Sequence, residues 1–435
     1  MKEFMYNFIK NHYMLNRTPV SEDSDKVIDS IKRTLGCNVI EVASGTECLT
    51  WFIPKYWKVR SAYFARLDGR KIIDYHNSPL HLWLHSIPFQ GEISREDLEG
   101  HLCYDKNKPD WIPYHYRNSY RFSAEEWGFC LPYNDYLKLK DDRYYVHIDT
   151  DLDTKGTMKI ADCWIKGKHP ETIFFAAHTC HPGQVTDGLS NVAVLISLFQ
   201  HLRLCKDLNY SYRLILGPEY FAAAGFLSAV PQSEITLLKG GIYLDFIGNN
   251  QPFAYQTSFQ ADSLLDRVIA NIFEHHVPYS TRNSYRELCG NDETFYNGPG
   301  FLIPTPSIIC KIHPEYHFNS DNLDIVNINQ LQFAVDIIKE IINIIETDYI
   351  PVPMFKGPIY LSRYNLYIDP QVDRKGYDNL EHIQLLIDGE HSCLEIAYEL
   401  GIDYYCVKKF CDALSEKSLI EIEFAHSLNK NKGCA

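Results

Sequence analysis

The sequence of 435 residues lacks any uninterrupted apolar run of about 18 residues, the length that a membrane-spanning helix requires. Its first twenty residues contain no apolar core followed by a small-residue cleavage site, so we expect no signal peptide. Repeats and low-complexity tracts are also missing. These absences exclude a membrane-spanning helix and favour a cytoplasmic globular protein.

Cysteine is present, but it lacks the paired spacing of a zinc knuckle. The chain has 13 cysteines, and none of them forms a Cys-x-x-Cys pair. Their odd number and scattered positions indicate free thiols in a reducing compartment. The cysteines therefore predict neither a disulfide framework nor a structural zinc site.

Basic residues are in the minority. Lysine and arginine number 42 against 56 acidic residues, which gives a net charge of −14. Such a balance does not favour a nucleic-acid or membrane-surface partner. The apolar content of 45% and charged content of 23% are those of an ordinary globular protein, and the length predicts two or three domains.

The first part of the chain changes character near residue 50. Residues 1–50 show helical spacing of apolar side chains, with Ser21 as a capping hydroxyl before two acids. Residues 51–130 are aromatic, rich in proline and strand-like, and Leu67-Asp68-Gly69 predicts a hairpin turn. We interpret residues 51–130 as an inserted β-rich subdomain. The alternative is a long structured loop of the main domain.

Alternating strand and helix patterns fill the middle of the chain and predict an α/β domain made of residues 1–50 and 131–350. The predicted strands are 144–148, 173–177, 212–216, 241–244 and 305–309. The predicted helices are about 189–204, 221–229, 261–275 and 328–346. Three prolines, Pro351, Pro353 and Pro358, predict a linker after this domain.

The last segment, residues 360–435, predicts a winged helix-turn-helix. A helix is followed by a second helix that opens at Ser392, a turn at Gly401 and a third helix, and residues 419–424 alternate like a β-wing. Residues 366–435 carry 13 acidic and 7 basic side chains, and only Lys408 and Lys409 lie on the third helix. Because DNA binding needs basic residues against phosphates, we favour a packing, dimerisation or regulatory role over DNA recognition.

Metal-capable side chains follow successive predicted strands. They are His178, His181 and Asp187 after the first, Glu219 after the second, Asp245 at the end of the third, and Asp292, Glu293 and His317 in later loops. Singly, each has a plain alternative: a loop histidine is usually a surface residue, and Glu219 or Asp245 could cap a helix. Together they converge, because the carboxyl ends of parallel strands meet at one sheet edge. Histidine and aspartate there are typical Zn²⁺ ligands.

The sequence resembles the bacterial zinc aminopeptidases, and more closely a bacterial aminopeptidase-like family. The matching strings are IPKYW, EEWGFCLP, HTCHP with its following Asp, LGPE, CGNDE and EYHFNSDN, and they extend over most of the chain. This resemblance implies a mixed sheet flanked by helices, an inserted N-terminal region of unknown function and a C-terminal winged helix.

The resemblance also implies roles for individual residues. Metal ligands would be His178, Asp187, Asp245 and His317, with Asp187 at the position that bridges two zinc ions in the aminopeptidases. Glu219 matches the general base. Tyr220 stands where the aminopeptidases have a second glutamate that binds zinc. Because two-metal sites need a full set of ligands, we predict one well-held Zn²⁺ ion.

The remaining candidates concern the substrate. His181 would complete the ligand set or contact substrate, and Tyr220 or His181 would stabilise a tetrahedral intermediate. Asp292 and Glu293 would pair with a free amine. Cys180 is more readily explained as a core residue than as a ligand.

The favoured hypothesis is a zinc-dependent hydrolase that cleaves an amide or peptide bond next to a free amino terminus, in a small peptide or aminoacyl amide, with Glu219 as general base. Two alternatives stay open. One is a zinc-dependent acyl transferase or cyclase on the same fold. The other is a non-catalytic regulatory protein that acts through its winged helix. Under each hypothesis we leave open whether the chain forms a homo-oligomer.

Overall fold

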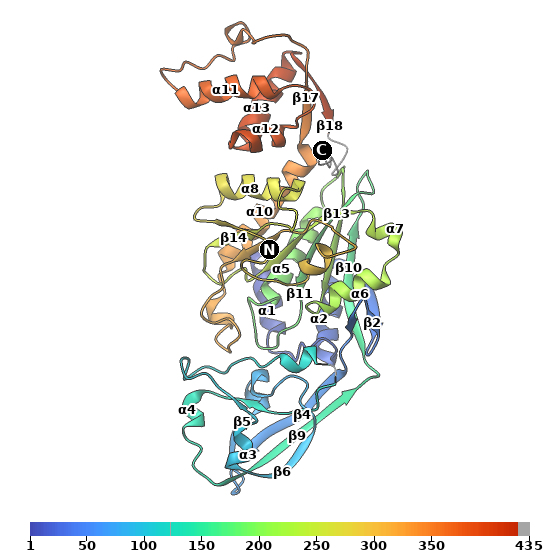
Figure 1. Ribbon diagram of the computed structural model, residues 1–435, viewed down its shortest axis with the longest axis vertical. Helices are drawn as coiled ribbons and strands as arrows, with labels where there is room; N and C mark the ends of the chain where they lie inside the picture. The colour runs from blue at the N-terminus through green and yellow to red at the C-terminus, as the bar shows by residue number, and fades with distance from the viewer. Residues whose placement is uncertain (122, 425–435) are drawn as a thin grey trace.

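The computed structural model describes residues 1–121 and 123–424, and Figure 1 shows three parts stacked along its long axis. A central α/β layer lies between a four-stranded sheet at one end and a group of C-terminal helices at the other. No helix among the described residues is long and apolar enough to cross a membrane.

The central sheet has eight strands and is mixed. Their order is β1 (Asn38–Ala43), β10 (Thr157–Ile165), β12 (Ser211–Gly217), β11 (Thr172–His178), β13 (Leu238–Asp245), β16 (Ser307–Cys310), β14 (Phe253–Gln256) and β15 (Thr281–Asn283). The inner four, β12, β11, β13 and β16, are parallel, whereas β10 and β14 run antiparallel beside them. This arrangement confirms the predicted mixed α/β fold.

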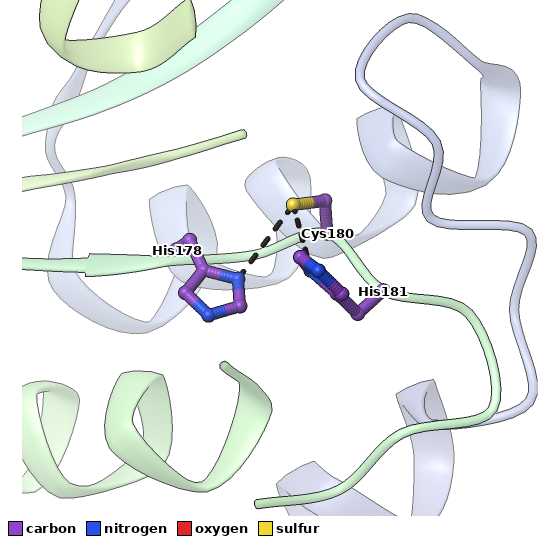
Figure 2. A group of neighbouring side chains, drawn as sticks. All are labelled: His178, Cys180 and His181. Atoms are coloured by element: carbon purple, nitrogen blue, oxygen red, sulfur yellow. Dashed lines mark hydrogen bonds between the residues drawn. The ribbon is translucent and has the colours of Figure 1, made fainter. Parts of the chain in front are cut away.

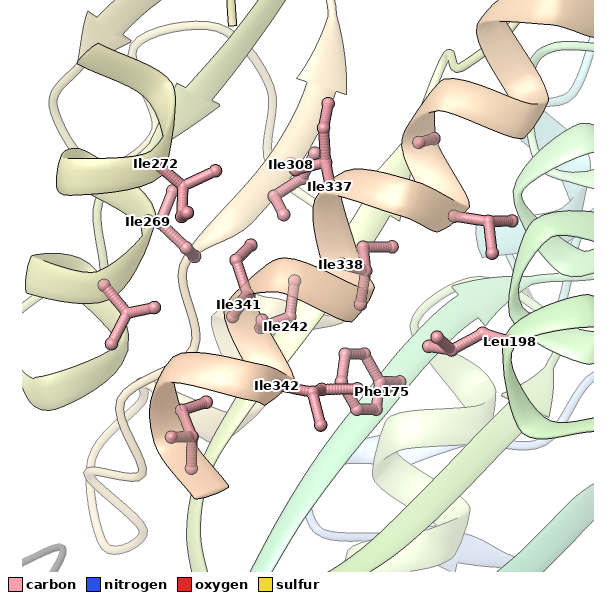
Figure 3. Close-up of a cluster of buried hydrophobic side chains, with 14 of the residues drawn as sticks. Phe175, Leu198, Ile242, Ile269, Ile272, Ile308, Ile337, Ile338, Ile341 and Ile342 are labelled. Carbon is pink, nitrogen blue, oxygen red and sulfur yellow. The ribbon is translucent and has the colours of Figure 1, made fainter. Parts of the chain in front are cut away.

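Helices cover both faces of this sheet. One face packs against α1 (Lys2–His12), α2 (Glu22–Leu35), α5 (Leu189–Leu202), α8 (Leu264–His276) and α10 (Ile328–Thr347). The other packs against α6 (Phe221–Ala229), α7 (Gln232–Ile235) and α9 (Glu293–Tyr296). Figure 3 shows isoleucines of α10 between the sheet and α8. This burial of apolar area fixes the strand ends that carry the polar loops.

Most predicted elements of this layer are confirmed. Four predicted strands correspond to β11, β12, β13 and β16, and the four predicted helices correspond to α5, α6, α8 and α10. The Ser21 hydroxyl caps α2 by accepting a hydrogen bond from the Ser24 N–H. The sequence prediction omitted β1, β10, β14 and β15, which are short or half-buried.

A second, antiparallel sheet of four strands lies beside the central layer. Its order is β5 (Lys71–Asp74), β4 (Tyr56–Ala65), β9 (Arg143–Asp153) and β6 (Phe89–Ser94). The predicted hairpin turn joins β4 to β5, where the Arg66 N–H donates to the Arg70 carbonyl. The strand predicted at 144–148 lies within β9, so its assignment to the α/β sheet was wrong. The domain boundaries themselves stay a prediction.

Short elements complete this region and the loops. They are β2 (Glu47–Cys48), β3 (Trp51–Phe52), β7 (Leu102–Cys103), β8 (Phe129–Cys130), α3 (Arg95–Glu99), α4 (Tyr133–Tyr136) and the 3₁₀ turns Tyr75–Asn77, Pro79–His81, Arg117–Tyr120, Leu323–Ile325 and Leu361–Tyr364.

The C-terminal part contains α11 (Arg374–Leu386), α12 (Cys393–Leu400), α13 (Tyr404–Glu416) and β18 (Ile420–Phe424). β18 pairs antiparallel with β17 (Tyr349–Pro353), a strand that precedes these helices. Pro351 and Pro353 therefore lie in a strand rather than in the predicted linker. The winged helix-turn-helix stays a prediction, and its last residues, 425–435, lie outside the described residues.

Candidate metal centre

The predicted metal-capable residues lie at one edge of the central sheet. His178 is the last residue of β11, Asp245 is the last residue of β13, and Glu219 follows β12 by two residues. His317 lies in the loop after β16. Since these strands are parallel, their carboxyl ends share this edge, as in other open α/β proteins.

Asp187 lies at the centre of the cluster. Its Oδ1 is 3.1 Å from His178 Nε2, and its Oδ2 is 3.1 Å from His317 Nε2 and 4.0 Å from His181 Nε2. His178 Nε2 also lies 3.5 Å from Asp245 Oδ1. The structure thus brings together the four predicted ligands and His181.

Two atoms of this cluster are buried without a hydrogen bond. Among the described residues, His178 Nε2 and Asp187 Oδ2 have no hydrogen-bond partner, although each faces nitrogen or oxygen atoms nearby. A buried polar atom without a partner is costly unless another group satisfies it. Nitrogen and carboxylate lone pairs that converge in this way fit a Zn²⁺ ion, which takes such ligands at about 2.0–2.2 Å. His178, Asp187 and Asp245 form one triad suited to an ion, and His181, Asp187 and His317 form another.

Cys180 orients the two histidines of the first loop. Its Sγ lies 3.6 Å from His178 Nδ1 and 3.1 Å from His181 Nδ1, and Figure 2 shows the thiol between the two rings. The sulfur also accepts the Glu219 N–H at 3.3 Å. Because the Nδ1 atoms contact the thiol, the Nε2 atoms are left facing the carboxylates. Cys180 is buried, as the sequence suggested.

Arg17 holds the same loop from the N-terminal side, a role that no pattern in the sequence predicted. The side chain is fully buried between α1 and α2. Its guanidinium donates to the carbonyls of Thr179, Cys180, His181 and Gln184 at 2.5–2.9 Å. Burial lowers the pKa of Arg17 to about 10, which leaves it charged at neutral pH.

Four non-glycine residues in these loops have positive φ angles. They are His181 (74°), Tyr220 (59°), Phe246 (56°) and His317 (62°). A left-handed backbone at such side chains is strained, and strain of this kind is concentrated at functional sites. Each of these residues is within two positions of a candidate residue or is itself one.

Burial and the neighbouring charges set the ionisation of the cluster. Burial tends to raise the pKa of Asp187, but the imidazoles of His181, His178 and His317 outweigh it and hold that pKa well below its usual range. Burial raises the pKa of Glu219 to about 7, against the lowering effects of His178 and of a short hydrogen bond donated by the Tyr120 hydroxyl. A carboxyl poised near neutral pH beside a metal-capable cluster is suited to proton transfer.

Tyr220 turns away from the ligand cluster. Its hydroxyl donates to the Gly290 carbonyl, and its ring stacks on Trp51 with centroids 5.3 Å apart. Asp292 accepts a short hydrogen bond from the Tyr220 N–H, and burial raises its pKa to about 7. Both oxygens of Glu293 accept the Asn291 N–H, and burial raises its pKa to about 8. These two carboxylates hold the 290 loop, and substrate contact by either stays a prediction.

The segment 112–120 of the second sheet region covers the open side of the cluster. The Tyr114 N–H donates to the His317 carbonyl at 2.9 Å, and the Tyr114 ring lies 5.1 Å from the His181 ring. Tyr116 packs on His317 with ring centroids 4.9 Å apart. The motifs found in the sequence did not predict a role for these two tyrosines or for Tyr120.

The sheet, its helical layers and the cluster at its carboxyl edge define a protein with the zinc-aminopeptidase fold. Residues 6–348 match the family described as domain of unknown function DUF4910, and the chain belongs to that family.

Comparison with individual proteins agrees with this assignment. A protein of Clostridium acetobutylicum, provisionally named as a polysaccharide biosynthesis protein with an aminopeptidase-like domain, is 28% identical and covers 96% of each chain. A crystal structure from the same organism, provisionally described as a peptidase, is 26% identical with a TM-score of 0.84 and covers 97% of this chain and 96% of that one. The zinc aminopeptidase BSAP of Bacillus subtilis shares the fold at 12% identity and a TM-score of 0.55, over 78% of this chain and 94% of that one.

Proposed function

We propose that this protein is a zinc-dependent hydrolase that cleaves an amide or peptide bond next to a free amino terminus. The observation that carries the proposal is the Glu219 carboxylate, whose Oε2 lies 3.7 Å from His181 Nε2 beside the Asp187-centred ligand cluster. A general base next to a metal-capable cluster is the arrangement that amide hydrolysis requires. The aminopeptidase-like relatives support the same reaction class.

In this proposal, one group of residues binds the metal and another transfers the proton. His178, Asp187, Asp245 and His317 would provide the metal ligands. A bound Zn²⁺ ion supplies Lewis acidity toward the scissile carbonyl and acidifies water. Glu219 accepts a proton from the attacking water and delivers it to the leaving nitrogen. The Tyr120 hydroxyl donates to Glu219 and so fixes the orientation of the carboxylate.

The direct test is the substitution Glu219→Gln. It removes the proton acceptor and keeps the shape of the side chain, so we expect turnover of an aminoacyl amide to fall by about 10²-fold or more. Metal content should stay at the wild-type level. Glu274→Gln is the matched control because Glu274 is exposed on α8, and it should leave turnover unchanged. Loss of metal in Glu219→Gln would make Glu219 a ligand instead.

The acyl transferase or cyclase alternative differs in the acceptor of the acyl group. Hydrolysis in H₂¹⁸O places the label in the new carboxylate of the product, and mass spectrometry detects it. A product without label, or a lactam or transferred acyl group, would favour the alternative over hydrolysis.

A further inference from the structure

We propose that this centre holds two metal ions, and that His181 supplies a ligand for the second. The proposal deepens the proposed function, on which it rests in taking the cluster as a metal centre.

The two oxygens of Asp187 face different partners. Oδ1 lies 3.1 Å from His178 Nε2, whereas Oδ2 lies 3.1 Å from His317 Nε2 and 4.0 Å from His181 Nε2. Two ligand atoms on one tetrahedral Zn²⁺ ion are separated by about 3.3 Å. The distance from Oδ1 to His178 Nε2 and the distance from Oδ2 to His317 Nε2 therefore each fit two ligands of one ion. In two-metal sites the ions lie about 3.5–4 Å apart, so one carboxylate can bind an ion with each of its oxygens.

His181, and not Tyr220, is built to face the second position. The hydroxyl of Tyr220 is engaged with the Gly290 carbonyl, on the Trp51 side of the residue. In contrast, His181 is 4% exposed, has a φ of 74° and places Nδ1 against Cys180 Sγ. These restraints leave Nε2 directed at Asp187 and near Glu219. The backbone strain is explained if a metal bond to Nε2 offsets it.

The two positions differ in charge and in exposure. The first has one imidazole and two carboxylates, all of them buried. The second has two imidazoles and shares one carboxylate, and the His317 side chain is 19% exposed. Fewer negative ligands hold a divalent ion less tightly, and imidazoles favour Zn²⁺, Cu²⁺, Ni²⁺ or Co²⁺ over Mg²⁺. The second ion should therefore be the first to leave on chelation.

The test counts ions without using activity. Metal-free protein is loaded with Zn²⁺, freed of excess by gel filtration and measured by plasma mass spectrometry. We expect two ions per wild-type chain, one in His181→Ala and two in Tyr220→Phe, which keeps the ring and serves as the control. Stepwise chelation of the wild type should release one ion at lower chelator concentration than the other.

Crystals of the zinc-loaded wild type provide a measurement that does not depend on a variant folding. Anomalous scattering at the zinc edge should give two peaks on opposite sides of Asp187. Saturation at one ion per chain, two ions in His181→Ala, or a peak at Cys180 Sγ instead would overturn the proposal. One ion with normal amide hydrolysis would refute only the second position, whereas two ions without hydrolysis would refute only the proposed reaction.

Discussion

At the scale of single residues, Arg17 is the main support of the loop that carries His178 and His181. It brings one buried positive charge to four backbone carbonyls of that loop. Those carbonyls lie in a turn and not in a regular element, so few other donors are within their reach.

Replacing Arg17 with Met should remove these donors while keeping most of the apolar stem. Each buried carbonyl left without a donor costs about 1–3 kcal/mol, so we expect a loss of at least roughly 3 kcal/mol in the free energy of unfolding. Zn²⁺ affinity should fall as well because the loop loses its fixed shape. Urea unfolding and zinc titration measure the two effects. Wild-type values in both would show that the loop does not need Arg17.

Gly188 tests the packing around the first ligand. A Cβ atom at this position would lie 2.6 Å from His178 Cε1, so Gly188→Ala should displace the imidazole and weaken zinc binding at least about tenfold. Gly300→Ala is the matched control, because Gly300 has a similar φ of +89° and an added Cβ there meets no atom within 4 Å. Equal zinc affinity in the two variants would contradict the expected displacement.

The residues of the candidate centre were largely predictable, but their supports were not. His178, Asp187, Glu219, Asp245 and His317 could be found because each lies at the end of an apolar strand pattern or in the loop that follows one. Arg17 could not, since its partners are carbonyls more than 160 residues away, which leave no trace in side-chain spacing. The direction of the Tyr220 side chain depends on a φ of 59° and on Trp51, and neither is visible in the local sequence.

At the scale of elements, β17 and the start of α12 are joined through a buried carboxyl. Asp348 precedes β17 and accepts the Leu394 N–H of α12 at 3.0 Å. Burial raises the pKa of Asp348 to about 7. A raised folded-state pKa means that the folded state prefers the protonated carboxyl, so the stabilisation present at low pH is lost as pH rises toward 7.

Asp348→Asn should remove this pH dependence while the amide oxygen still accepts the Leu394 N–H. As pH rises from about 4 to 7, the free energy of unfolding of the variant should increase relative to that of the wild type, by an amount on the order of a few kcal/mol. Melting curves of both proteins at several pH values provide the comparison. A stability difference that does not change with pH would contradict the assignment to Asp348.

The secondary structure was predictable where burial is uniform. β11, β12 and β13 are buried along almost their whole length, which leaves continuous apolar runs in the sequence. β1 is half-exposed and gave a weaker pattern. The apolar spacing of β9 predicts a strand but does not say which sheet it joins. Pro351 and Pro353 are tolerated in β17 because that strand pairs on one side only, with β18.

At the scale of the whole molecule, the candidate site is assembled from three distant segments. The N-terminal arm supplies Arg17, the central layer supplies the ligands and Glu219, and segment 112–120 supplies the covering tyrosines. The tyrosines reach the site only through the packing of the second sheet region on the central layer.

Tyr120→Phe should report on that docking. The Tyr120 hydroxyl lowers the pKa of Glu219 by donating to it, so its removal should raise that pKa. Glu219 must be unprotonated to act as a base, and activity is lost as pH falls through its pKa. The acid limb of the kcat/KM profile should therefore move to higher pH in Tyr120→Phe. Tyr116→Phe, which keeps the ring on His317, is the control. An acid limb that does not move in Tyr120→Phe would show that the Tyr120 hydroxyl does not influence the pKa of Glu219.

The C-terminal helices are attached to the central layer through the start of α13. Both ends of the Asn271 amide are used there: its nitrogen donates to the Ile402 carbonyl and its oxygen accepts the Tyr404 N–H. Tyr405 donates to Glu340 on α10. In helix-turn-helix proteins, the N-terminal residues of the second helix contact bases. The start of α13 is held here by contacts with α8 and α10, and a packing role for this part of the chain stays a prediction.

We propose that Glu219 and a Zn²⁺ ion held at the edge of the sheet act together in the hydrolysis of an amide bond beside a free amine. The most direct measurement is amine release from an aminoacyl anilide by metal-free protein, before and after Zn²⁺ is restored, with the N-acetylated substrate in parallel. We predict no release without metal, recovery with Zn²⁺, and no cleavage of the acetylated substrate. Cleavage that is independent of metal, or none with Zn²⁺ across a panel of aminoacyl anilides, would contradict the proposed zinc-dependent hydrolysis.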